Sequence, residues 1–185
     1  IPKGQPRMSA GASAPIRRSF NRALFTILCL GLLLVLILIE LLPLHEPHWR
    51  VLLLFPLNVL VYLGAGLLAW YHRPSNRMGA LILLTGVWVF LGGAANTDVA
   101  ALVLLGTTAS SMPLAGFVHL LLAFPAGRVR GRVARATVGL AYFTSVVLEA
   151  PHYLFTPDPE LPGLAIADAP ELARWGGFAQ EMVGF

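Results

Sequence analysis

The chain has 185 residues, of which 57% are hydrophobic and only 12% are charged. Soluble domains are usually about a quarter charged, so this composition excludes an ordinary soluble domain. The net charge of +4 comes from local arginine clusters, which indicates membrane topology and contact with anionic lipid head groups, and not nucleic-acid binding. The single cysteine, Cys29, can form no internal disulfide.

Five apolar runs follow a basic segment, residues 1–22, that is rich in Gly, Pro, Ser and Ala. We expect this segment to be a mobile tail, because it cannot build a core. A helix of about 20 apolar residues crosses a bilayer, and the first run is too long to be the core of a signal peptide. The predicted spans cover residues 23–42, 49–71, 78–95, 99–124 and 133–150. Pro56 should kink the second span or mark a local break, and Pro113 lies in the middle of the fourth.

The charges predict the orientation of these spans. With the N-terminus inside, the inner segments are the tail, residues 72–77 and residues 125–135, which hold every Lys and Arg except Arg50 and Arg174. The nine acidic residues all lie at outer span ends or in outer segments. Basic loops stay cytoplasmic. We therefore expect an all-α integral membrane protein of the bacterial plasma membrane, a bundle of five transmembrane helices over residues 23–150 with a cytoplasmic N-terminus.

Residues 151–185 are predicted to be extracytoplasmic, with a proline-rich loop and then a capping signal at Asp168 and Glu171. Four apolar residues follow at helical spacing: Leu172, Trp175, Phe178 and Met182. They predict an interfacial helix, or the start of a sixth span, with these side chains on lipid or on an apolar helix surface.

Signatures of soluble enzymes are missing from the sequence. It contains no phosphate-binding loop, no Cys-x-x-Cys pair, no His-Glu-x-x-His helix and no Gly-x-Ser-x-Gly turn. We accordingly predict no catalytic, cofactor-binding or metal-binding residue in this chain. Within the spans, Asn58 and Tyr62 share a helix face and are interpreted as inter-helix contacts. His119 is either a functional ionisable group or, as we favour, a neutral histidine hydrogen-bonded to a neighbouring helix.

A group of carboxylates and imidazoles lies at the outer helix ends. Its members are Glu40, His45, Glu46, His48, Asp98, Glu149 and His152. Such groups can bind a divalent metal or respond to pH near neutrality, so they form a candidate sensing cluster. Their spacing matches no defined metal site, and helix capping in water is the favoured alternative. We expect at least one imidazole of His45, His48 and His152 to approach a carboxylate.

The two inner loops carry a family resemblance. They read HRPSNRMGALILLTG over residues 72–86 and HLLLAFPAGRVRGRVARA over residues 119–136. The pair resembles the membrane-embedded N-terminal sensor region of actinobacterial multi-pass histidine kinases, with an Arg-Pro-x-Asn-x-x-Gly loop and a His-Leu-Leu-Leu-Ala-Phe-Pro-x-Gly-Arg stretch. The matching residues are Arg73, Pro74, Asn76, Gly79, His119, Phe124, Pro125, Gly127 and Arg128.

This resemblance implies a role in two-component signal transduction. In the family the membrane region precedes a dimerisation and phosphoacceptor helix pair and an ATP-binding domain, and neither occurs in these residues. The chain would then be the sensing and signal-transmitting half. The missing region would form the homodimer and would contact the response regulator. Because His119 lies in a predicted span, we do not assign it as the phosphoacceptor. We expect the gene to continue past Phe185 with at least one more span. The alternatives are a fragment of a secondary transporter and a structural membrane subunit.

Overall fold

The computed structural model describes residues 13–44, 47–147, 171, 174, 175 and 178. All regular structure in the described residues is helical. The helices are α1 (Ser13–Leu41), α2 (Trp49–Leu52), α3 (Leu54–His72), α4 (Met78–Ala94), α5 (Ala100–Thr108), α6 (Met112–Ala123) and α7 (Arg132–Val147). The all-α prediction is therefore confirmed for the described residues.

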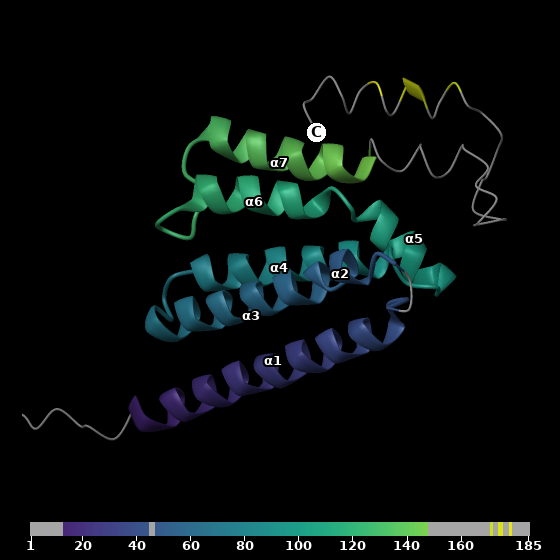
Figure 1. Cartoon of the computed structure of the whole chain (residues 1–185). Helices are drawn as coiled ribbons and strands as arrows, with labels where there is room; N and C mark the ends of the chain where they lie inside the picture. The colour runs from purple at the N-terminus through teal and green to yellow at the C-terminus, as the bar shows by residue number, and fades with distance from the viewer. Residues whose placement is uncertain (1–12, 45–46, 148–170, 172–173, 176–177, 179–185) are drawn as a thin grey trace, which may run out of the picture.

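The long helices lie side by side in chain order (Figure 1). Helix α1 packs on α3, α3 packs on α4, α4 packs on α6, and α6 packs on α7. Along the chain, α1, α3, α4, α6 and α7 alternate in direction, as short connections require. The α3–α4 loop, the α6–α7 loop and the start of α1 consequently lie at the same end of the bundle, which we call the inner end (Figure 1).

Three helical segments are long and apolar enough to cross a membrane. They are Ser19–Leu41, Trp49–His72 and Ala100–Ala123. Helix α4 is apolar but has only 17 residues, about 25 Å of helix, against a hydrocarbon core of about 30 Å. Helix α7 begins with Arg132 and has Arg135 in its first turn. The structure thus supports a membrane protein, whereas the five-span count stays a prediction.

Both prolines inside the predicted spans lie next to helix breaks. The helix of the second span is interrupted at Leu53, three residues before Pro56, which has no N–H to continue the ladder. In the fourth span, residues 109–111 separate α5 from α6, and Pro113 sits in the first turn of α6. Helix α5 accordingly turns away from the axis of α6 (Figure 1). The break predicted at Pro56 is confirmed.

Helix α1 starts earlier than expected. It begins at Ser13, so the part of the predicted mobile tail from residue 13 to 22 is helical, and that prediction was wrong there. The glycines and most prolines of the tail precede Ser13, and Pro15 lies in the first helical turn, where its missing N–H is tolerated. Residues 1–12 lie outside the described part of the chain.

Small residues let the helix backbones approach closely. A Cβ atom built on Gly79 of α4 would lie 2.7 Å from the Gly66 carbonyl oxygen and 2.7 Å from the Trp70 amide nitrogen, both in α3. A Cβ atom on Gly116 of α6 would lie 2.9 Å from the Thr85 hydroxyl of α4. Such contacts are the usual means of helix association in lipid, where apolar side chains gain nothing by leaving the hydrocarbon.

Large apolar side chains face outward, which is the reverse of a soluble bundle. On α1, Leu30, Leu33 and Leu36 are each more than half exposed, with exposed fractions of 55%, 53% and 60%. The buried positions include small residues such as Ala115 and Ala123. This pattern fits a protein whose solvent is lipid.

Replacing Gly79 by alanine should destabilise the bundle. The added methyl group meets backbone atoms of α3 that cannot rotate away, and overpacking of this kind costs about 1–3 kcal/mol. Gly64→Ala in α3 is the matched control, because nothing lies within 4 Å of its Cβ position and alanine favours a helix over glycine by about 1 kcal/mol. Thermal denaturation in detergent should therefore show a lower midpoint for Gly79→Ala only. Equal midpoints for both variants would contradict the packing described.

Candidate functional site

The two inner loops meet at Asn76. Its side-chain nitrogen donates a hydrogen bond to the Pro125 carbonyl oxygen at 3.0 Å, across 49 positions of sequence. Its side-chain oxygen accepts a hydrogen bond from the Met78 amide at 3.0 Å and so supplies an acceptor for the first turn of α4. One amide therefore starts α4 and joins the α3–α4 loop to the α6–α7 loop. We call Asn76, Pro125 and Gly127 the loop junction.

Gly127 completes the loop junction because only a glycine fits there. Its φ is +67°, in the left-handed region that side chains disfavour. A Cβ atom would meet the Asn76 side-chain oxygen and would lie 2.5 Å from the Met78 amide nitrogen. The Gly127 amide donates to the Ala123 carbonyl oxygen at 2.8 Å, which closes the end of α6. The loop can thus turn and touch the neighbouring loop at the same residue.

The structure brings several, but not all, of the motif residues together. Asn76, Pro125 and Gly127 are in direct contact, and Gly79 lies at the α3–α4 crossing one turn away. Arg73, Pro74 and Arg128 are exposed, and so is Phe124. The motif therefore contains a structural part, which holds the loops together, and a basic part, which faces outward.

His119 meets a partner that the sequence did not identify. Its Nδ1 atom lies 3.4 Å from the Tyr142 hydroxyl of α7, with the two rings edge to face at 5.9 Å. The buried indole nitrogen of Trp88 in α4 has no hydrogen-bond partner among the described residues. This matches the interpretation of His119 as a histidine bonded to a neighbouring helix. The available signal was the presence of Trp88 and Tyr142, two aromatic residues with polar atoms inside apolar runs.

Asn58 and Tyr62, the two polar residues that share a face of the second predicted span, have different surroundings. Tyr62 packs against α4, because a Cβ atom on Gly86 would lie 2.8 Å from the Tyr62 Cβ atom. Asn58 is exposed and donates instead to the Leu54 carbonyl oxygen of its own helix at 2.8 Å. The inter-helix interpretation is wrong for Asn58, since an amide on a lipid-facing surface is satisfied by the nearest backbone acceptor.

The outer cluster is described only in part. Glu40, His48 and Asp98 are exposed, and His48 forms no ion pair with Glu40 or Asp98 at the 4.0 Å limit of a salt bridge. The described residues contain no group of three or more His, Cys, Asp or Glu side chains able to hold a metal ion. The remaining members, His45, Glu46, Glu149 and His152, lie outside the described residues. Neither the sensing interpretation nor the capping one is tested for them.

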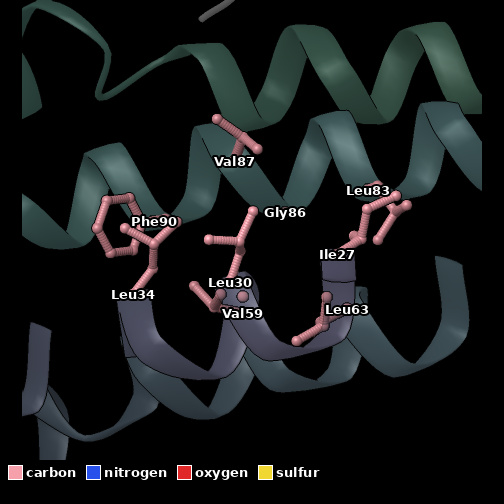
Figure 2. A pocket seen from close by; sticks show the side chains of 10 residues that line it. Ile27, Leu30, Leu34, Val59, Leu63, Leu83, Gly86, Val87 and Phe90 are labelled. Atoms are coloured by element: carbon pink, nitrogen blue, oxygen red, sulfur yellow. The ribbon is translucent and has the colours of Figure 1, made fainter. Parts of the chain in front are cut away.

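An apolar pocket of about 200 Å³ lies between α1, α3 and α4 (Figure 2). Its ten lining residues are all apolar, and Leu30 and Leu34 of α1 face Val87 and Phe90 of α4 across it. It offers no polar group that could orient a ligand. We interpret it as a loosely packed interface between helices that is open to lipid.

In the C-terminal segment, Trp175 and Phe178 are exposed and pack edge to face on each other, with ring centroids 6.3 Å apart. Glu171 and Arg174 form an ion pair. Leu172 and Met182 lie outside the described residues. Both aromatic rings are exposed and therefore free to contact lipid. The interfacial helix stays a prediction.

Comparison with protein-family models, with curated proteins and with solved structures finds no match for this chain.

The loop junction predicts a difference between two glycine variants. Gly127→Ala and Gly131→Ala both place a side chain at positive φ, where the backbone cost is about 1–2 kcal/mol. Only Gly127→Ala also drives a methyl group into Asn76 and the Met78 amide, because nothing lies within 4 Å of the Gly131 Cβ position. Amide hydrogen exchange of residues 73–79 should therefore accelerate in Gly127→Ala alone. Equal acceleration in both variants would mean that the loops are not coupled.

Proposed function

We propose that this chain is the membrane-embedded input region of a bacterial two-component sensor histidine kinase. The observation that carries the proposal is the loop junction. The two motifs that resemble the kinase family are separated in sequence, and their residues Asn76, Pro125 and Gly127 nevertheless meet. Residues that recur together in a motif are expected to serve one site, and this contact supplies a physical reason for the pairing.

The orientation forms part of the proposal. The basic loops lie at one end of the bundle, with Arg73 and Arg77 in one loop and Arg128 and Arg130 in the other. Arginine-rich loops are retained in the cytoplasm. We infer that the inner end faces the cytoplasm, that five spans cross the plasma membrane, and that residues 151–185 are extracytoplasmic.

Signal transmission requires an element with two arrangements. The breaks at Leu53 and at residues 109–111 supply points where helix segments can reorient. The second break is tied to α7, because the Ser145 hydroxyl lies 3.3 Å from the Ser111 carbonyl oxygen and 2.8 Å from the Ala141 carbonyl oxygen. A change at the outer half of the bundle would therefore shift α7, and through the loop junction it would shift the cytoplasmic loops.

The transporter alternative finds less support. Transporters of the broken-helix type place paired breaks near the bilayer midplane, in corresponding positions of two repeats. Here the break at Leu53 follows the four-residue helix α2 and lies near one end of its span, whereas residues 109–111 lie near the middle of theirs. The two breaks are not equivalent, so a sensor fits the geometry better.

Topology is the first test. In a chain with Cys29→Ser, cysteines introduced as Arg130→Cys and Asp98→Cys should label oppositely with a membrane-impermeant thiol reagent in intact cells. Asp98→Cys should react at once, and Arg130→Cys only after the membrane is opened, because the inner loops are cytoplasmic. Strong labelling of Arg130→Cys in intact cells would overturn the orientation.

Kinase coupling is the second test, made in the natural full-length protein. The full-length protein should incorporate acid-labile phosphate from ATP, and Ser145→Ala should shift this activity about threefold, since one membrane hydrogen bond is worth about 0.6 kcal/mol. Thr137→Ala is the matched control, because the Thr137 hydroxyl donates to the Val133 carbonyl oxygen of its own helix at 3.1 Å. A full-length protein with no phosphoacceptor or ATP-binding domain would refute the sensor-kinase proposal, and substrate uptake would favour the transporter.

A further inference from the structure

An open pocket of about 740 Å³ lies at the inner end, between α4, the α6–α7 loop and α7. Three arginines line it, Arg77, Arg128 and Arg135, together with the His119 imidazole. Its apolar lining includes Leu81, Leu84 and Val138. The pocket adjoins the loop junction, because Gly127 also lines it. Neither the membrane topology nor the proposed signalling role requires a cavity of this composition.

The basic side of the pocket has an uncompensated charge. Residues 72–77 and 125–135 contain arginine but no aspartate or glutamate. The Nε atom of Arg135 donates to the Gly131 carbonyl oxygen at 3.2 Å, which fixes the position of that side chain at the start of α7. Guanidinium groups match phosphate oxygens with paired hydrogen bonds, so three arginines that line one pocket favour an anionic ligand.

The apolar side of the pocket determines the kind of anion. Leu81, Leu84 and Val138 come from helices α4 and α7 and continue toward the interior of the bundle from the level of the arginines. At the same end, Phe124 and Val133 are 71% and 81% exposed, which places apolar side chains at the height of the basic loops. A ligand that satisfies both sides needs an anionic head and a hydrocarbon tail.

We propose that this pocket binds one anionic phospholipid, with its phosphate held by Arg77, Arg128 and Arg135 and the upper part of its acyl chains against Leu81 and Leu84. The volume lies within the range of about 300–1,000 Å³ that is usual for ligand sites. The lipid would lie against both the α3–α4 loop and the α6–α7 loop, next to the loop junction. The site does not depend on the sensor function and would exist equally in a transporter or a structural subunit.

The test uses the full chain in nanodiscs that contain equal amounts of phosphatidylglycerol and phosphatidylcholine. Native mass spectrometry of the released protein should show one phosphatidylglycerol retained in preference to phosphatidylcholine. Arg77→Gln and Arg128→Gln should each reduce this preference about fivefold, the factor expected for one arginine near a lipid surface. Arg130→Gln is the matched control, because it removes the same charge from the same loop at a residue that does not line the pocket.

A second variant tests the shape of the site without changing its charge. Ala80 lines the pocket, so Ala80→Phe should fill it and lower the retention of phosphatidylglycerol while circular dichroism shows an unchanged helix content. Equal losses in Arg130→Gln and Arg128→Gln would mean diffuse attraction to the membrane surface, and would overturn the proposal. Displacement of the lipid by inorganic phosphate alone, with no effect of Ala80→Phe, would identify a soluble-anion site instead and would overturn it as well.

Discussion

Close contact between helix backbones around α4 is the constraint on which the other features depend. In lipid, a leucine gains little by moving from hydrocarbon to a helix surface, so association relies on van der Waals contact at short range. Helix α4 obtains this contact on two sides, through Gly79 and Gly86 against α3 and through Thr85 against Gly116 of α6. These contacts fix the register of α3, α4 and α6 along their axes. Asn76 can reach Pro125 only because that register is fixed.

The limits of sequence-based prediction follow from the same physics. The third span was predicted over residues 78–95 and α4 covers Met78–Ala94, because an apolar run with polar ends defines a helix locally. The start of α1 at Ser13 was missed because a composition averaged over residues 1–22 hides the boundary within them. The sequence shows aromatic residues with polar atoms inside the apolar runs. Which of them contacts His119 depends on the register of α6 against α7, which no spacing within one helix encodes.

In the candidate site, too, local features could be predicted from the sequence, whereas contacts between distant segments could not. The motif residues were identified from the sequence as two separate groups, and nothing in their spacing indicated that Asn76 would join them. A side-chain amide is well suited to this position because it donates and accepts at once, whereas aspartate would keep the acceptor for Met78 and lose the donor for Pro125. Gly127 is required for two reasons at the same time, its positive φ and its contact with Asn76. Sequence reasoning can recognise the first kind of requirement at a turn, but the second appears only in three dimensions.

The loose packing of α1 has a consequence for how the protein is made. Only 11% of the apolar stretch in Ser19–Leu41 is buried, against 28% in Trp49–His72 and 22% in Ala100–Ala123. A helix that is satisfied by lipid on nearly every side can leave the translocon and settle in the bilayer alone. Helix α4 is shorter, and its close backbone contacts form only when α3 and α6 lie beside it. We therefore expect α1 to enter the bilayer as an independent helix, and α4 to enter the membrane together with its neighbours.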